Sequence, residues 1–269
     1  MAHNDGPIQF KGSIGNIRSY YDRSLKKYIL STKGGANKNL IKNNPAFART
    51  RDCMNEFTGC SKWSSKFRKC LLVIDHLMYS RYFSMLVKMS KAIQVRDEEN
   101  TYGFRSIEPS KAPYLLREIN FNQQIPFQGV IREAYSVNFS QDKKTVRFSM
   151  PGFIPRTRLN WPTPFQLFRF YLVIAQVSDM VWNEKDRHYY LVVDDLGRLT
   201  RCSTSEWMVN NAEPVDILME VSFDESALTL PGTTVIVALG VEMATDVTGG
   251  TAYVTPGNGT MGIVEGFVK

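Results

Sequence analysis

Apolar and polar positions divide the chain into three stretches with different periods. In the first, at residues 10–32, β-branched and aromatic residues flank a polar connection at residues 22–27, and Gly34 and Gly35 follow. This pattern is typical of a β-hairpin. Because isolated two-stranded ribbons are only marginally stable, we expect the hairpin to pack on the rest of the chain or on another molecule.

A helical period begins at Pro45. Asn44 can cap a helix that has Pro45 as its first residue, and apolar residues then recur at steps of three, four and seven. Gly59 and nearby serines favour a break near residues 58–61. A second helix, near residues 79–95, has one apolar stripe: Tyr82, Met85, Leu86, Met89 and Ile93. We predict that the two helices form an antiparallel pair.

After a charged stretch with glycine and two prolines, short apolar runs recur up to residue 268, separated by turns such as residues 141–144, 194–197 and 248–251. This spacing predicts an antiparallel β-sandwich of immunoglobulin-like character, although the Cys-Trp-Cys signature of antibody domains is absent. The predicted fold class is therefore α+β, with an N-terminal hairpin at residues 1–44, a helical hairpin at 45–100 and a sandwich at 101–269.

Positive charge is concentrated near the N-terminus. The 269 residues carry a net charge of +7, and residues 11–70 hold 14 lysines and arginines against only three acids, Asp22, Asp52 and Glu56. The remainder of the chain is mildly acidic. Such asymmetry attracts nucleic acid or an anionic surface, and it also suits head-to-tail packing of identical subunits.

The four cysteines show no C-x-x-C pair. Cys53, Cys60 and Cys70 fall in the predicted helical stretch, and the first two are seven residues apart, too far along a helix to form a disulfide. We therefore expect free thiols in a reducing compartment. The histidines have no ligand spacing around the cysteines, so we expect neither a metal nor a cofactor.

Membrane and export signals are also missing from the pattern. Residues 1–7 lack the apolar run of a secretory signal, and the longest apolar stretch, residues 167–177, is interrupted by Arg169 and Gln176. We expect a chain that is cytoplasmic as synthesised and has no membrane span. Release within an assembled particle is compatible with this expectation.

No catalytic motif stands out. A phosphate loop would need a strand that leads into a helix with Lys-Ser or Lys-Thr at its start, and the glycines around Gly12, Gly15 and Gly34 lack that context. Adjacent Asp194 and Asp195 are typical of a turn rather than of a metal pair. We therefore expect a protein that is not an enzyme.

Basic and aromatic residues of the N-terminal part are the best candidates for assembly or partner contact. Aromatic faces stack on bases while lysines and arginines bind phosphates. The simpler interpretation is a solvated hairpin face with its tyrosines packed on a helix, because no recognised nucleic-acid motif accompanies the charge. The candidate residues are Gly12, Gly15, Arg18, Tyr20, Tyr21, Arg23, Lys26, Lys27, Tyr28, Lys33, Arg49 and Arg51.

Several motifs carry a family resemblance: Gly12-x-x-Gly15-Asn16, Lys33-Gly34-Gly35, the run Asn44-Pro-Ala-Phe-Ala-Arg-Thr-Arg51, and Asn55-Glu-Phe57. With these motifs the chain resembles a family of uncharacterised proteins from Bacteroidetes-type bacteria. The segments at residues 151–155 and 239–242 resemble the same family. The resemblance implies one shared architecture and no catalytic assignment.

Three functions are compatible with these patterns. The first is a structural subunit that builds a homopolymer, such as a filament, tube or particle, through its N-terminal hairpin and the edges of its sandwich. The second is a nucleic-acid-binding accessory protein that uses the basic segment 11–70. The third is a carbohydrate- or protein-binding module in which Trp161, Trp182 and Trp207 make contact, although packing explains these tryptophans equally well.

Overall fold

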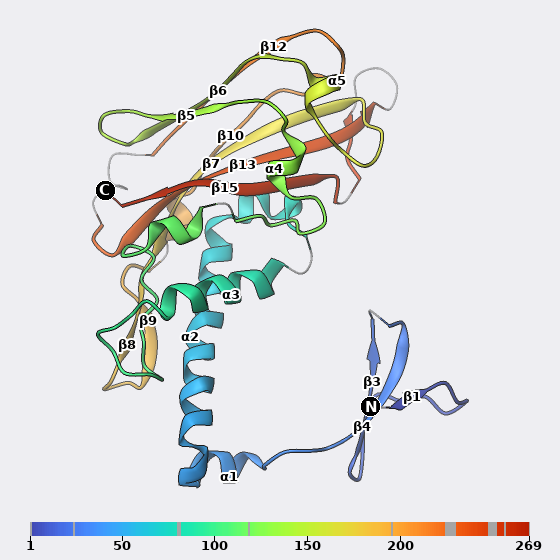
Figure 1. Cartoon of the computed structure of the whole chain (residues 1–269), viewed down its shortest axis with the longest axis vertical. Coiled ribbons are helices and arrows are strands. Elements are labelled where there is room, and N and C mark those ends of the chain that lie inside the picture. The colour runs from blue at the N-terminus through green and yellow to red at the C-terminus, as the bar shows by residue number, and fades with distance from the viewer. Residues whose placement is uncertain are drawn as a thin grey trace. The chain divides into compact units, whose positions relative to one another are not determined.

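The computed structural model describes residues 2–23, 25–79, 82–117, 119–194, 196–223, 230–246, 252–255 and 257–268. Over these residues helices combine with antiparallel sheets, which confirms the α+β class (Figure 1). The chain divides into two compact units, Met1–Arg51 and Asp52–Lys269. The turn expected at residues 248–251 lies outside the described residues, and so does Asp195 in the turn expected at 194–197.

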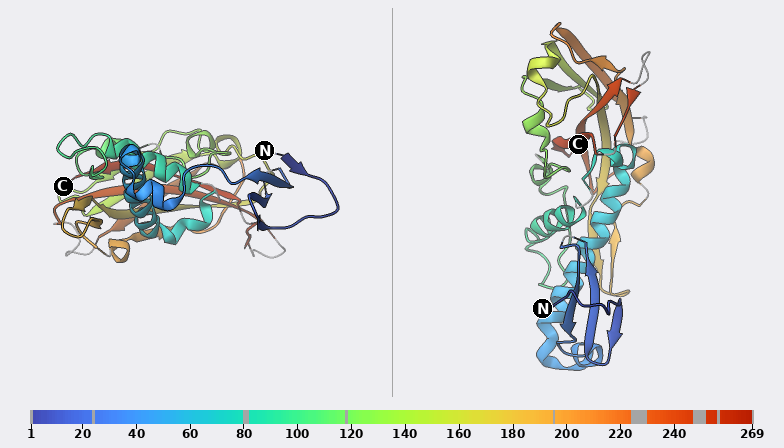
Figure 2. Two further views of the ribbon diagram at one scale, coloured as in Figure 1. Left: turned by 90° about the horizontal axis from the view of Figure 1, so that it is seen from below. Right: turned by 90° about the vertical axis from the view of Figure 1, so that its right-hand side faces the viewer.

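The N-terminal unit contains the predicted hairpin within a four-stranded sheet. β3 (Ile17–Asp22) pairs antiparallel with β4 (Lys27–Thr32), and Lys26 in the turn between them has a φ of 53°. β2 (Gly12–Ile14) and β1 (Ala2–Asn4) extend the sheet to the order β1-β4-β3-β2, drawn in blue in Figure 2. The hairpin prediction is confirmed, with one additional strand on each side.

A short helix, α1 (Lys38–Asn43), leads to the single turn of 3-10 helix η1 (Pro45–Phe47). The side chain of Asn44 caps η1 and accepts a hydrogen bond from the backbone amide of Ala46 at 2.9 Å. The predicted cap is therefore confirmed. The α-helical turns begin after this 3-10 turn, in α2 (Ala48–Cys70).

Helix α2 runs for 23 residues without the break expected at residues 58–61. Gly59 has a packing role instead: a Cβ atom there would lie 2.9 Å from the ring of Tyr189. Glycine is therefore required for close approach of this ring, and the helix continues because the face that carries Gly59 is buried on both sides of it, at Glu56 and at Cys60 and Trp63.

Two further helical segments follow, η2 (Leu72–Leu77) and α3 (Tyr82–Gln94). The predicted stripe of α3 is confirmed, since Tyr82, Leu86, Met89 and Ile93 are buried and Met85 packs against them. The antiparallel pair is not seen. Figure 1 shows α3 crossing α2 rather than running alongside it, and the hydrogen bonds between the helices gather at one place, where Ser90 donates to the Cys60 carbonyl.

Two antiparallel sheets make up most of the second unit. The larger has the order β10-β7-β13-β14, with β11 beside β7 and β15 beside β13, and the smaller has the order β12-β6-β5. Their strands are β5 (Ser136–Phe139), β6 (Thr145–Phe153), β7 (Leu167–Ser178), β10 (Arg201–Thr204), β11 (Met208–Val209), β12 (Val215–Ser222), β13 (Thr233–Asp246), β14 (Ala252–Tyr253) and β15 (Gly259–Phe267). The hairpin β8 (Met180–Asn183) and β9 (His188–Leu191) and the short helices η3 (Pro113–Leu116), α4 (Phe127–Val130), α5 (Pro155–Arg158) and η4 (Leu196–Leu199) complete the described elements.

Strands β7 and β13 are buried on both faces, which is why both are almost continuously apolar. Successive strand residues point to opposite faces and therefore enter different cores. Phe170 and Leu172 belong to the core shared with the smaller sheet. Tyr171 and Val173 belong to the core shared with α2 and α3.

The helices are part of the same unit as the sheets. Trp63 and Phe67 of α2 and Leu86 of α3 share one core with Ile236 and Ile263 of the larger sheet. The division between units accordingly falls at residues 51 and 52, whereas the sequence pattern suggested divisions near residues 44 and 100. Among the described residues, no helix combines the length and the apolar character needed to cross a membrane.

Candidate functional site

The twelve residues predicted to contact partners all lie in the N-terminal unit. Gly12 and Gly15 adopt φ values of 132° and 55°, in the region that favours glycine. Arg18, Tyr20 and Tyr21 lie in β3, Lys27 and Tyr28 in β4, Arg23 and Lys26 in the turn between these strands, Lys33 directly after β4, and Arg49 and Arg51 near the start of α2.

The strand register divides the aromatic and basic residues between the two faces of the sheet. Tyr21 lies opposite Tyr28, with ring centroids 5.2 Å apart, and the Lys11 ammonium lies 5.9 Å from the Tyr21 ring. The neighbouring Tyr20 points to the other face, where the Arg18 guanidinium lies 5.2 Å from its ring. Each face therefore carries its own small cation and aromatic pair.

Arg51 serves the connection between the helices. Its Nη1 donates hydrogen bonds to the carbonyl oxygens of Ile41, at 2.8 Å, and Asn44, at 2.9 Å. These bonds fix α1 and η1 against the start of α2. Arg51 is therefore used within the unit, whereas most of the other eleven candidate residues are exposed.

Exposed apolar side chains lie beside the outer strand β2. Ile14 of β2 and Ile17 of β3 are opposite each other in register and are 66% and 48% exposed. Ile8 and Leu25 are also largely exposed. Among the described residues β1 and β2 each pair on one side only. Unpaired strand edges with exposed apolar residues are surfaces on which another chain can add.

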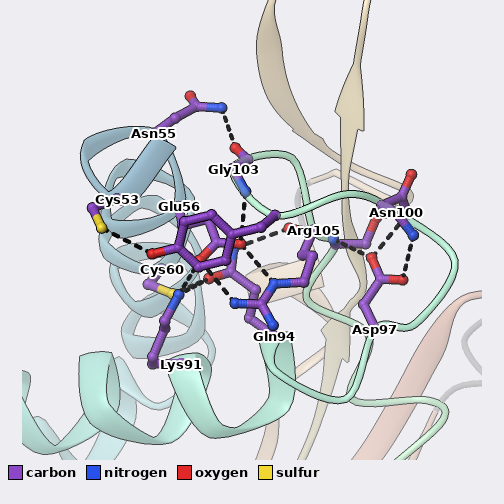
Figure 3. Close-up of polar contacts among 12 residues, drawn as sticks. Cys53, Asn55, Glu56, Cys60, Lys91, Gln94, Asp97, Asn100, Gly103 and Arg105 are labelled. Carbon is purple, nitrogen blue, oxygen red and sulfur yellow. Dashed lines mark hydrogen bonds and ion pairs between the residues drawn. The ribbon is translucent and has the colours of Figure 1, made fainter. Parts of the chain in front are cut away.

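A buried carboxylate in the second unit was not predicted from the sequence. Glu56 of α2 is fully buried, and Arg105 binds it with Nε to Oε1 at 2.7 Å and Nη2 to Oε2 at 3.0 Å (Figure 3). The Gly103 amide donates to Oε1 at 3.1 Å, and Lys91 forms an ion pair with Oε2. Gln94 of α3 accepts a hydrogen bond from Lys91 at 3.0 Å.

Burial raises the pKa of Glu56, but the hydrogen bonds from Arg105, Lys91 and Gly103 outweigh it and lower the pKa to about 2. The carboxylate is therefore ionised at neutral pH and its oxygens are occupied by donors. Such a group anchors the segment around Gly103 to both helices. A signal for it exists in the sequence, because Glu56 falls on the same helical stripe as the buried residues Cys60 and Trp63.

The loop that carries Arg105 is itself held by Asp97. This carboxylate accepts hydrogen bonds from the backbone amides of Glu99, at 2.9 Å, and Ser106, at 2.6 Å, and from the Asn100 side chain at 2.8 Å (Figure 3). Burial raises the pKa of Asp97, but these hydrogen bonds outweigh burial, so the pKa lies below that of an ordinary aspartate. Asp97 thus holds the loop on both sides of Arg105, at Glu99 and Asn100 before it and at Ser106 after it.

A second buried carboxylate lies on the helix-facing side of the larger sheet. Glu242 of β13 is opposite Arg169 of β7 and accepts hydrogen bonds from its Nε at 2.8 Å and from the Tyr171 hydroxyl at 2.8 Å. His76 Nε2 lies 3.3 Å from Oε1. Burial raises the pKa of Glu242, and the bonds from His76, Tyr171 and Arg169 lower it to about 2.

Neither cluster has the composition of a metal site. No group of three or more histidine, cysteine or acidic side chains suited to a metal occurs among the described residues. Cys53, Cys60, Cys70 and Cys202 are free thiols. Burial raises the pKa of Cys60 and raises that of Cys70 to about 12, so both are neutral thiols at physiological pH.

The three tryptophans considered for ligand contact have packing partners. Trp182 lies between Phe104 and Tyr189, with ring centroids 5.1 Å from each. The Arg169 guanidinium lies 4.3 Å from the Trp207 ring. Trp161 packs against the core between the sheets.

Two open depressions border the contacts of Glu56 and Asp97. One, of about 420 Å³, lies between α2 and α3 and is lined by Phe57, Val87, Lys88 and Tyr102. The other, of about 260 Å³, is bordered by acids of residues 97–108 and by Lys111, which pairs with Glu99 and Glu108. Ion pairs and hydrogen bonds within the protein therefore engage Asp97, Glu99, Glu108 and Lys111 at the second depression.

Comparisons with known proteins give no relative for this chain. No protein-family model matches it, no curated protein matches it, and no solved structure matches it.

Proposed function

We propose that this chain is a non-enzymatic structural subunit that self-assembles into a homopolymer, such as a filament, tube or particle. The contacts are made by its N-terminal sheet and by the edges of its C-terminal sheets. Strand addition at an open edge supplies backbone hydrogen bonds in register, and apolar side chains beside that edge add buried area. In this proposal the partner of each subunit is another copy of the same chain.

The observation that supports the proposal most strongly is the exposed pair Ile14 and Ile17 beside the outer strand β2. A sheet that leaves such residues in water gains stability when a second chain covers them. Charge supports it too, because residues 1–51 hold ten lysines and arginines against two acids, and the rest of the chain is close to neutral. Segregated charge orients one subunit on the next.

The test replaces the exposed pair in the full-length protein. The double variant Ile14→Lys/Ile17→Lys is expected to reduce the mass measured by light scattering toward that of the monomer, because it places two charges at the proposed contact. Val95→Lys is the matched control, since Val95 is 52% exposed and lies outside both sheets. Deletion of residues 1–35 is expected to act like the double variant. An unchanged mass in both altered proteins would refute the proposal.

The alternative function is nucleic-acid binding by the basic segment 11–70, supported by the Arg18 and Tyr20 pair and by the excess of positive charge. It predicts binding that weakens steeply with salt, with a slope of about 0.9 per phosphate contact on logarithmic scales. Arg18→Gln/Lys27→Gln should reduce that slope, and Lys88→Gln/Lys185→Gln in the second unit should not. Absent or salt-insensitive binding in a gel shift would exclude this function.

Two finer assignments complete the proposal. We propose that the two sheets which share a core form a sandwich of immunoglobulin-like character, and that the chain belongs to the Bacteroidetes-type family whose N-terminal motifs it resembles. The proposed place of synthesis is the cytoplasm, followed by assembly there or release within the assembled particle. None of these assignments requires a cofactor.

A further inference from the structure

A cavity of about 250 Å³ lies between the C-terminal half of α2 and the chain that follows β9. Trp63 and Phe67 form one wall, with ring centroids 5.0 Å apart, and both are buried. The remaining apolar walls come from Val177, Leu191, Val193 and Leu196. An apolar cavity of roughly 150 Å³ is enough to hold benzene, so a single aromatic ring fits here with space to spare.

The polar side-chain groups of Trp63 and Ser178 in the walls are already hydrogen-bonded within the protein. Trp63 Nε1 donates to the carbonyl oxygen of Ser178 at 2.8 Å, and the Ser178 hydroxyl donates to the carbonyl oxygen of Asp179 at 2.8 Å. Cys70 at the edge of the cavity is a neutral thiol, because burial raises its pKa. The interior therefore offers no charge and suits an apolar group.

The rim, in contrast, is cationic. Lys66 and Lys69 are three residues apart on α2 and therefore lie on the same face of the helix. Lys66 Nζ pairs with Asp194 at 3.0 Å. Among the described residues Lys69 has no ion-pair partner, so none of their acids neutralises its ammonium group at the mouth.

We propose that this cavity binds a small carboxylate whose apolar part is about the size of one aromatic ring. The ring occupies the space between Trp63, Phe67 and Val193, and the carboxylate meets Lys69 at the rim. The cavity belongs to the second unit and the exposed pair Ile14 and Ile17 to the first, so the two proposals rest on different residues and are tested independently.

The test compares phenylacetate with phenylacetamide, which has the same shape and no charge, by ligand-observed NMR titration of the full-length protein. Phenylacetate is expected to bind saturably and more tightly than the amide. Lys69→Gln should weaken phenylacetate binding about two- to fivefold, the range that an exposed ion pair contributes, and leave the amide unchanged. Lys88→Gln, another exposed lysine, is the control.

Val193→Phe fills the cavity and should abolish binding of both probes. If the Val193→Phe protein does not fold, the Lys69→Gln protein still tests the proposal. Equal affinity for the two probes would overturn the proposal, as would the absence of saturable phenylacetate binding. Lys69 also lies in the last turn of α2, where a cation stabilises the helix end. If the Lys69→Gln protein loses stability but keeps its affinity for phenylacetate, Lys69 only stabilises the end of the helix, and the proposal is overturned.

Discussion

Arg105 binds Glu56 through two parallel hydrogen bonds of 2.7 and 3.0 Å, and the carboxylate is fully buried (Figure 3). This contact joins the middle of α2 to a loop 49 residues later in the chain. Bidentate pairs of this kind fix orientation as well as distance. The loop at residues 97–106 is therefore a fixed part of the second unit rather than a linker between two domains.

Removal of the guanidinium should destabilise the protein strongly. Arg105→Met leaves Glu56 buried with fewer donors, and breaking a buried ion pair from one side costs about 3–5 kcal/mol of unfolding free energy. Denaturant titration measures the loss. Arg96→Met is the control, because Arg96 is exposed and should change the unfolding free energy by less than about 0.5 kcal/mol. Equal losses in the two variants would contradict the account.

Acid should weaken the fold through Glu56 and Glu242. The pKa of each carboxyl is about 2 in the folded chain and near 4.5 when unperturbed. The unfolded chain therefore binds more protons between these values, and the unfolding free energy falls as the pH drops from about 4.5 toward 2. Above 4.5 the full contribution is present.

The variant Glu56→Gln tests this dependence. It removes one titrating group, so its unfolding free energy should fall less steeply than that of the unaltered protein over the same pH range. Chemical denaturation at a series of pH values measures both slopes. Identical slopes would mean that Glu56 does not contribute to the acid sensitivity.

Gly59→Ala should destabilise the protein although alanine favours helices. The alanine Cβ would lie 2.9 Å from the Tyr189 ring, and overpacking of a core costs about 1–3 kcal/mol, more than the gain of about 1 kcal/mol in helix propensity. In a Tyr189→Leu background the same substitution should cost less, because the ring is absent. A stabilised Gly59→Ala protein would show that the ring moves aside freely.

Local patterns predicted local structure well. The hairpin β3–β4, the Asn44 cap and the buried stripe of α3 each depend on residues within a few positions of one another, and all three are present. The α+β class follows from the same periods. The packing role of Gly59 inside α2 could not be predicted, because it depends on the approach of Tyr189 from a distant hairpin.

The charge clusters lay beyond local patterns for the same reason. Glu56 on an apolar stripe signals a buried partner, but Arg105 becomes that partner only when the loop folds back on α2. Likewise, Glu242 meets Arg169 only through the register of β13 on β7. The candidate contact residues were placed in one unit by sequence proximity, while their division between two faces required the strand register.

The central claim of self-assembly is tested most directly by mass photometry, combined with negative-stain electron microscopy, of the purified full-length protein at several salt concentrations. We predict regular filaments, tubes or closed particles, with masses that are multiples of the 30.7 kDa chain. The Ile14→Lys/Ile17→Lys protein should lose them. A uniform monomer at every salt concentration would contradict the claim and would favour nucleic-acid binding by the basic segment 11–70.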